Sequence, residues 1–198
     1  MTRTDKPLEE LVRELPPELH GPVRDGIEEL LKGHALRAAD PRPPEPPAGA
    51  GVSLREVTGD TVRVVCRLSD TLVPPRRYFV APNAVSIAQA HFEPKAWFRA
   101  IYADETPVGF IMLYDDPDEP VYFLWRLMVG TPYQGKGFGR RAVERLIDYV
   151  KTRPGATELL VSCGEGSGSP EAFYEKLGFR RNGKVYGDEV GLALPLAP

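Results

Sequence analysis

Hydrophobic positions repeat with two alternating periods over residues 51–198, which is typical of a mixed α/β domain. Runs rich in β-branched and aromatic residues predict strands at 51–57, 97–103, 108–114, 121–129 and 158–163, with a strand pair closing the chain. Helical spacing predicts helices that begin near residue 60 and cover 83–90, 138–150 and 170–177. The expected order is therefore β-α-α-β-β-β-α-β-α-β-β.

Residues 1–50 have a different character, because they hold 9 of the 21 prolines. Apolar residues at helical spacing predict two short helices, around 8–15 and around 23–31. Five prolines between positions 41 and 47, followed by alternating alanine and glycine, are typical of a linker. We expect a helical N-terminal extension over 1–39, a linker over 40–51 and the main domain over 52–198. The extension is too short to fold alone, so it is expected to serve packing or a homodimer.

The charge of the chain does not indicate a nucleic-acid or membrane partner. Lysine and arginine total 25 against 28 acidic residues, which gives a formal net charge of -3. No apolar run approaches the ~18 residues of a membrane helix, and the acidic N-terminus is unlike a signal peptide. We expect a cytoplasmic protein that binds neither nucleic acid nor membranes.

The sequence contains few residues that could form a metal site or a disulfide bond. Cys66 and Cys163 are far apart in the sequence and form no CxxC pair, so reduced, buried thiols are expected. The histidines at 20, 34 and 91 have no partner at metal-ligand spacing. No metal site is predicted.

The most informative stretch is the glycine-rich segment QGKGFG at 134–139, between a hydrophobic strand and an amphipathic helix. A P-loop would need Ser or Thr at Gly137 to hold magnesium, and a dinucleotide fingerprint would place its third glycine one position after Gly139. A turn of purely structural use is a third interpretation. Glycines at a helix N-terminus suit a pyrophosphate better, because they remove obstructing Cβ atoms and the first helical turn has unpaired N–H groups. Lys136 and Arg140 add positive charge.

This segment resembles the signature of the GNAT superfamily of acetyl-coenzyme A dependent N-acetyltransferases, in which Arg or Gln precedes two spaced glycines. Gln134, Gly137 and Gly139 fill that signature, and FYEKLGF at 173–179 is similar to the tyrosine-bearing segment of the family. The chain further resembles bacterial diamine and polyamine acetyltransferases through FVAPN at 79–83, IYADETPVGF at 101–110, WRLM at 125–128 and YQGKG at 133–137. The resemblance implies a GNAT-type enzyme with a mostly antiparallel central sheet flanked by helices.

The resemblance also implies how acetyl-CoA binds. In the family, the strand before the glycine turn separates from the next strand, and its free N–H groups bind the pantetheine arm. These groups map to Leu127 and Val129. The residues implied around the pyrophosphate are Gln134, Gly135, Lys136, Gly137, Phe138, Gly139 and Arg140. Ser167 or Ser169 stands where relatives commonly have an asparagine for the arm.

Tyr174 is the implied general acid, because a phenol with a pKa near ~10 is still protonated at neutral pH. Packing within its helix is the alternative role for this residue. The strand at 121–129 lacks the carboxylate that many relatives use as general base. Glu189 or a water relay is expected to remove the amine proton instead.

The implied acceptor is a primary amine of a small cationic molecule, a di- or polyamine. It would enter between the loop at 71–83 and the last hairpin, where Asp188, Glu189, Tyr186 and Trp97 are available to hold positive charge. An antibiotic or protein amine is an open alternative. A non-catalytic module that binds acyl-CoA or recruits a partner is another, but the presence of both the glycine turn and Tyr174 favours the enzyme.

Overall fold

The computed structural model describes residues 16–21, 25 and 45–196. The chain forms two compact units, residues 1–43 and residues 44–198. In the first unit residues 17–21 are helical, and Pro17 suits the first helical position because its missing N–H would have no intrahelical partner there. Apart from residue 25, the helices predicted around 8–15 and 23–31 lie outside the described residues.

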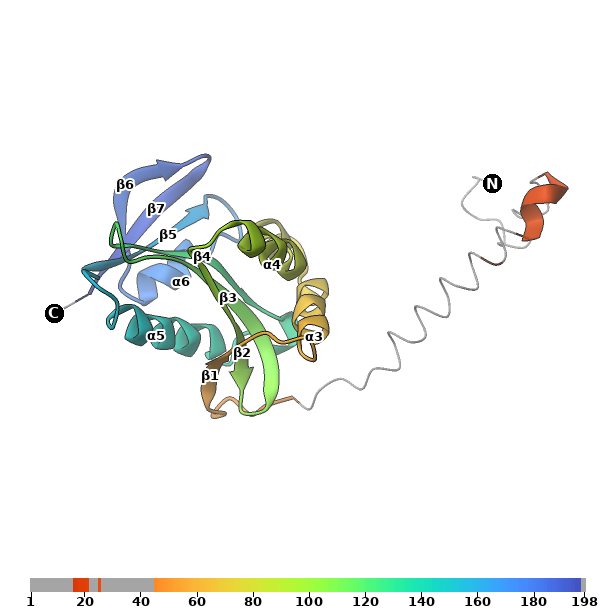
Figure 1. Cartoon of the computed structure of the whole chain (residues 1–198), viewed down its shortest axis with the longest axis horizontal. Coiled ribbons are helices and arrows are strands. Elements are labelled where there is room, and N and C mark those ends of the chain that lie inside the picture. Colours follow the sequence, from red (N-terminus) through yellow and green to blue (C-terminus); the bar gives the residue numbers. More distant parts are fainter. Residues whose placement is uncertain (1–15, 22–24, 26–44, 197–198) are drawn as a thin grey trace. The chain divides into compact units, whose positions relative to one another are not determined.

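The second unit is built on a seven-stranded sheet (Figure 1). Its strands are β1 (Val52–Arg55), β2 (Ala96–Ala103), β3 (Thr106–Asp116), β4 (Val121–Val129), β5 (Glu158–Gly164), β6 (Arg180–Tyr186) and β7 (Glu189–Pro195). They lie in the order β1-β2-β3-β4-β5-β7-β6, and each neighbouring pair is antiparallel except β4 with β5. The predicted mixed, mostly antiparallel sheet is confirmed.

Helices cover both faces of the sheet (Figure 1). One face carries α5 (Phe138–Val150) and α6 (Glu171–Lys176), and the other carries α3 (Val62–Arg67) and α4 (Asn83–Phe92). The connections contain three short 3-10 helices: η1 (Leu68–Thr71), η2 (Arg76–Tyr78) and η3 (Thr131–Tyr133). The order of strands and α-helices is the predicted one, with small shifts at the ends of single elements.

The packing of α5 follows directly from its sequence. Val143, Leu146 and Val150 recur at helical spacing and are fully buried against the sheet, whereas Glu144 and Arg145 between them are exposed. Each such buried aliphatic side chain contributes roughly 1.5 to 3 kcal/mol to stability. The spacing therefore determines which face of α5 packs on the sheet.

A second cluster of buried side chains lies on the opposite face of the sheet. It joins Val65 of α3 to Phe110 and Met112 of β3. Cys163 is buried, whereas Cys66 is only partly buried. The expectation of two buried thiols is therefore wrong for Cys66, because its short helix lies at the edge of this cluster with one side open.

β4 and β5 separate from each other towards their C-terminal ends. Parallel pairing joins only Phe123 to Leu160 and Leu124 to Val161. β4 nevertheless stays paired with β3 as far as Val129. The sheet is therefore split in its middle, beyond the point where β4 and β5 part.

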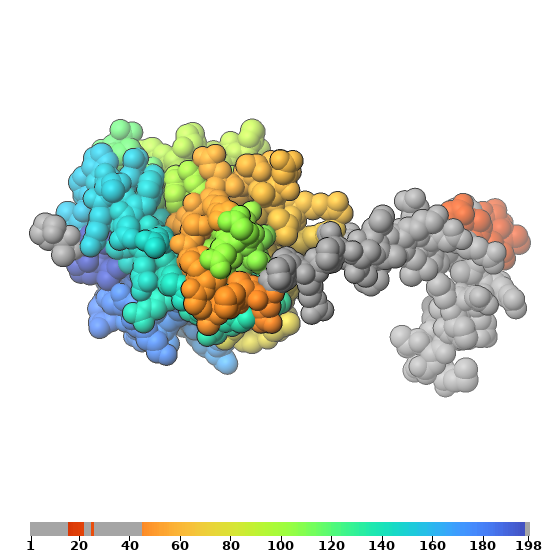
Figure 2. All heavy atoms as spheres, turned by 90° about the horizontal axis from the view of Figure 1, so that it is seen from below, coloured from red at the N-terminus to blue at the C-terminus, as the bar shows by residue number. Residues whose placement is uncertain are grey.

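The start of the second unit is fixed to the β2–β3 hairpin. Gly51 N donates a hydrogen bond to Asp104 Oδ1 at 2.9 Å, and Arg55 forms an ion pair with Glu105 at 2.8 Å. Asp104 has a φ of 49°, in the left-handed region that tight hairpin turns require. Figure 2 shows this start, in orange, around the green hairpin tip and beside α5 in teal.

Candidate active site

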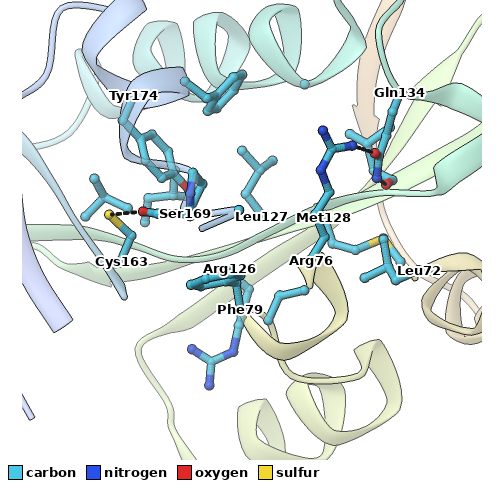
Figure 3. A pocket seen from close by; sticks show the side chains of 18 of the residues that line it. Leu72, Arg76, Phe79, Arg126, Leu127, Met128, Gln134, Cys163, Ser169 and Tyr174 are labelled. Atoms are coloured by element: carbon cyan, nitrogen blue, oxygen red, sulfur yellow. Dashed lines mark hydrogen bonds between the residues drawn. The ribbon is translucent and has the colours of Figure 1, made fainter. Parts of the chain in front are cut away.

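A cavity of about 800 Å³ lies where β4 and β5 separate (Figure 3). Its walls come from the loop around η2, the C-terminal half of β4, the glycine turn before α5, the C-terminal half of β5, α6 with the segment leading into it, and the first residue of β7. A volume of this size falls in the range of small-molecule sites. The cavity thus gathers segments from most of the second unit.

The backbone of β4 presents alternate residues to this cavity. Gly130 N donates to Val108 O of β3 at 2.9 Å. Because backbone groups alternate sides along a strand, those of Met128 also face β3, and those of Leu127 and Val129 face the split. The structure therefore places both predicted residues in the cavity wall with their N–H groups directed into the gap.

The glycine turn leaves an open space at the N-terminus of α5. Gly137 precedes the helix with a φ of 77°, in the left-handed region that glycine adopts without strain. Gly135 has the same φ, and a Cβ atom added there would meet nothing within 4 Å. The N–H groups of the first turn of α5 have no intrahelical partners, and the helix dipole adds positive potential. Gly135, Gly137, Phe138 and Gly139 all line the cavity here, so this turn can hold an anion.

Gln134 ties the turn to the strand before it. Its Nε2 atom donates to Val129 O at 2.8 Å, and its Oε1 atom accepts a hydrogen bond from Arg76. Arg76 comes from η2, far away in the sequence, and also lines the cavity. Arg140 lines it from α5 and forms an ion pair with Glu144 at 2.9 Å. Two arginines thus stand beside the anion-binding turn.

Lys136 is directed elsewhere, although the sequence predicted it as a cofactor-binding residue. Its ammonium forms an ion pair with Glu45 and approaches Pro46 O at 3.4 Å. The hydrogen bond from Lys136 lowers the pKa of Glu45. Lys136 is not among the residues that line the cavity, because Glu45 at the start of the unit holds its charge.

Tyr174 lies on α6 and lines the cavity from the α5 side of the sheet. Its ring packs between Phe173 and Phe179, with centroid distances of 5.2 and 5.5 Å, and the residue is only 5% exposed. Burial raises the pKa of Tyr174 well above its ordinary value, and the carboxylate of Glu189 acts in the same direction. The phenol therefore remains protonated at any pH near neutrality.

Glu189 lies in the cavity wall at the start of β7. Its Oε2 atom accepts a hydrogen bond from Ser162 Oγ of β5. Val161 and Cys163 belong to the core on the α5 side, so strand alternation directs Ser162, and with it Glu189, to the opposite face. The two predicted catalytic residues therefore face one cavity from opposite faces of the sheet.

Of the two candidate serines, Ser169 lines the cavity and Ser167 does not. Its hydroxyl contacts Cys163 Sγ at 3.9 Å and accepts a hydrogen bond from Glu171 N at 3.2 Å. These contacts fix Ser169 at the start of α6. Of the two positions that the sequence offered for the asparagine of relatives, the fold brings only this one to the site.

Several aromatic and acidic residues named as candidates lie away from this cavity. Trp97 stacks on Tyr149 with centroids 4.5 Å apart and lines a second cavity, of about 550 Å³. Tyr186 and Asp188, in the β6–β7 hairpin, are not among the residues that line the first cavity. Trp125 of β4 does line it, as do residues of the predicted entry loop at 71–83.

Sequence reasoning missed two arginines of the cavity, Arg76 and Arg126. Arg126 projects from β4 on the opposite side of that strand from Tyr174 (Figure 3). A cation inside a strand that is otherwise apolar was the available signal for Arg126. No feature of the sequence indicated that Arg76 belongs to the site. It lies in a basic, proline-rich loop, and only the tertiary fold brings this loop close to the glycine turn.

The residues that the structure describes contain neither a cluster of metal ligands nor a membrane-spanning helix. No group of three or more His, Cys, Asp and Glu side chains is arranged to hold a metal ion. Across the same residues, no helix has the length and apolar character needed to span a bilayer.

Comparison with curated proteins finds an L-2,4-diaminobutyric acid acetyltransferase from Streptomyces avermitilis, which is 32% identical over 73 residues. The match covers 36% of this chain and 41% of that protein. The chain therefore spans about two fifths of the length of this curated relative, and the remainder of the two sequences is not aligned.

Solved structures resemble the fold over nearly three quarters of the chain. The ribosomal-protein-S18-alanine N-acetyltransferase of Escherichia coli is 19% identical, with a TM-score of 0.56 over 75% of this chain and 96% of that one. The spermidine N-acetyltransferase of Vibrio cholerae, solved with CoA and spermine, is 15% identical, with a TM-score of 0.54 over 73% and 95%. At such low identities these likenesses show the fold alone.

The family is identified by a broader match. The model of the "Acetyltransferase (GNAT) family" matches residues 67–179, more than half of the chain, and covers both the glycine turn and Tyr174. The split sheet, the glycine turn and the buried tyrosine lie around one cavity within this range. The chain therefore belongs to the GNAT family of acetyltransferases, as its sequence motifs predicted.

Proposed function

We propose that this protein transfers the acetyl group of acetyl-CoA to a primary amine of a small molecule. The observation that carries the proposal is the convergence of an anion-binding turn, outward-facing strand N–H groups and a protonated tyrosine on one cavity. Acetyl-CoA supplies the activated acetyl thioester. The rest of the chemistry falls to the residues of the cavity wall.

The charges and the open space of the cavity support acetyl-CoA as the co-substrate. A pyrophosphate suits the turn at 134–139, because no side chain fills the space at Gly135 and the cations of Arg76 and Arg140 stand beside it. The N–H groups of Leu127 and Val129 suit the amide oxygens of a pantetheine arm and the oxyanion that develops on the thioester carbonyl. Ser169 offers a further hydrogen bond from α6.

The transfer needs two proton movements, and the cavity has a group for each. The amine nitrogen bonds to the acetyl carbon, the carbon–sulfur bond breaks, the amine loses a proton and the thiolate gains one. Tyr174 is the proposed acid for the thiolate, because burial keeps its phenol protonated. Glu189, directly or through water, is the proposed acceptor of the amine proton, because it is the carboxylate in the cavity wall.

For the acceptor we propose a diamine-type molecule. The motifs in the chain support a polyamine, and the Vibrio cholerae neighbour is named a spermidine acetyltransferase. The curated relative is named for a diamino acid, which supports a diamine that also carries a carboxylate. Cytoplasmic location and a homodimer remain predictions.

The test is a measurement of thiol release from acetyl-CoA in the presence of a panel of amines. The panel should contain spermidine, simple diamines, diamino acids, an aminoglycoside and a peptide with a free N-terminus. Acetylation of one of the small diamines supports the proposal. Acetylation of the aminoglycoside or peptide alone would move the acceptor to another class. Binding of CoA without acetylation of any amine would favour a non-catalytic module.

A further inference from the structure

The acceptor side of the cavity contains an arginine that the acetyl transfer described above does not use. Arg126 lies opposite Met112 in the β3–β4 register, and Met112 belongs to the cluster on the α3 and α4 face. Directly opposite residues of paired strands share a face, so Arg126 lies on that side. Its hydrogen bond of 3.3 Å to Gln89 Oε1 of α4 agrees with this placement.

An irregularity of β4 puts Arg126 beside an aromatic wall. The β3–β4 register shifts at this point, so that Leu124 and Arg126 lie opposite consecutive residues of β3 and Trp125 is the extra residue. Trp125 and Arg126 therefore share one face, with the Arg126 guanidinium 5.2 Å from the Trp125 ring centroid. Both residues line the cavity.

Among the residues that the structure describes, the hydrogen-bond partners of the Arg126 guanidinium are neutral groups. Its two terminal nitrogens donate to Trp125 O at 2.8 Å and to Gln89 Oε1 at 3.3 Å, and no carboxylate forms an ion pair with it. Its buried Nε atom has no hydrogen-bond partner. Burial lowers the pKa of Arg126, and the opposing influence comes from the carboxylate of Glu189. A half-buried guanidinium with this environment is suited to an anion that enters the cavity.

The other charged residues of the cavity indicate that a polycation would bind poorly on the side of Arg126. The charged residues of its wall are Arg76, Arg126, Arg140 and Glu189. Arg76 and Arg140 stand at the glycine turn, which leaves Arg126 and Glu189 on the opposite face of the sheet. A polyamine would bring several positive charges towards one carboxylate and one arginine. A molecule with one amine end and one carboxylate end would match both groups.

We propose that the acetyl acceptor is an amino acid with a side-chain amine, whose carboxylate binds Arg126 and whose amine end faces Glu189. The inference rests on the proposed acetyl transfer and names the substrate class of the same site. The reaction is unchanged: the side-chain amine nitrogen bonds to the acetyl carbon, the thioester carbon–sulfur bond breaks, and one proton passes from nitrogen to the departing sulfur. Arg126 acts as a specificity residue, since it holds a part of the acceptor that does not react.

The experiment compares two acceptors that differ only in the carboxylate. L-2,4-Diaminobutyrate and 1,3-diaminopropane have the same carbon chain between their amines, and the second lacks the carboxylate. With the full-length protein, kcat/KM should be about 10- to 100-fold higher for the acid, as expected for one hydrogen-bonded charge pair in a partly buried site. The same comparison with lysine and cadaverine extends the test to a longer side chain. A preference for either diamine, or for spermidine, would overturn the inference and leave the acetyltransferase function intact.

Variants of Arg126 locate the origin of this preference. Arg126→Gln should reduce the ratio of kcat/KM between acid and diamine to near one, and Arg126→Lys should retain part of it because the charge remains. Arg99→Gln is the matched control, since Arg99 stacks on Trp97 away from this cavity and should leave the ratio unchanged. An unchanged ratio in a folded Arg126→Gln protein would contradict the assignment. If Arg126→Gln fails to fold, the Arg126→Lys variant and the substrate ratio of the natural protein still test the assignment of Arg126. If no amine at all is acetylated, the proposed acetyltransferase function is itself contradicted.

Discussion

At the scale of single residues, Tyr174 gives the most direct test of the chemistry. Replacing it with Phe removes only the hydroxyl, because the ring contacts with Phe173 and Phe179 involve carbon atoms. We expect turnover to fall by about ten- to a thousand-fold, since a positioned acid commonly contributes ~10² to 10⁴. The affinity for CoA, measured by calorimetry, should change little.

Tyr186→Phe is the control. Tyr186 does not line the cavity, so removal of its hydroxyl should leave turnover unchanged. Full activity of the Tyr174 variant would assign this residue a packing role.

At the scale of elements, the contact between η2 and the glycine turn joins two distant segments. Arg76 donates to Gln134 and stands beside the proposed pyrophosphate position. Arg76→Gln should raise the Kd for CoA about tenfold, through loss of one charge-assisted contact. Affinity for acetyl-pantetheine, which lacks the phosphates, should not change.

Arg77 provides a matched control for this prediction, since it lies in the same 3-10 helix, is exposed and does not line the cavity. Arg77→Gln should bind CoA like the natural protein. Equal effects of the two substitutions would indicate general electrostatic attraction, and an equal loss of pantetheine affinity would indicate a disturbed loop.

A second contact between elements fixes the C-terminal end of α5 to β3 and predicts a pH dependence. Tyr149 donates to Asp115 Oδ2 at 2.6 Å, and Arg153 donates to Oδ1 at 2.9 Å. Burial, together with Asp115, raises the pKa of Tyr149 to about 12. Because the folded state favours the neutral phenol, its contribution to stability is complete below the unfolded pKa of ~10 and is lost as the pH rises towards 12.

The comparison of the natural protein with Tyr149→Phe isolates this effect. At pH 8 the variant should have a lower free energy of unfolding in urea, by about 1 to 3 kcal/mol, because it leaves Asp115 with one hydrogen bond fewer. The difference should shrink as the pH is raised above about 10. The other tyrosines ionise in both proteins, so their contributions cancel in the difference between the two free energies of unfolding. A difference that stays constant with pH would show that the Tyr149 phenol does not hold α5.

At the scale of the whole molecule, the question is what residues 1–43 contribute. The cavity and every motif of the family lie in the second unit. A protein that lacks residues 1–43 should therefore keep acetyl transfer, with changes confined to stability or oligomeric state by light scattering. Loss of activity in a folded truncation would show that the first unit takes part in catalysis.

A longer truncation should behave differently, because residues 45–50 contact the region of the glycine turn. Glu45 pairs with Lys136, and Arg141 donates to Ala48 O at 2.8 Å. Removing residues 1–50 should lower Tm by a few degrees relative to removal of 1–43, since about 1 kcal/mol corresponds to ~2 to 4 °C at this size. Equal Tm values would show that these contacts do not stabilise the unit.

The sequence by itself determined the order of the elements and the position of the anion-binding turn. Both depend on local properties: the period of apolar residues selects helix or strand, and glycines just before an amphipathic helix keep its N-terminus accessible. Leu127, Val129, Gly137 and Tyr174 line the cavity, as expected from short segments that resemble the motifs of the family. In such segments the backbone geometry depends little on the rest of the chain.

Only the tertiary structure decided which charged side chains face the cavity. Lys136 was expected at the site by its place in the motif, but Glu45 from the start of the unit holds its ammonium. Arg76 reaches Gln134 only because a loop 58 residues away in sequence crosses to the turn. Arg126 lines the cavity from the α3 and α4 face because an extra residue in β4 shifts the alternation of that strand. Long, flexible charged side chains take their partners from whatever the fold brings near them, and that information is not contained in local sequence.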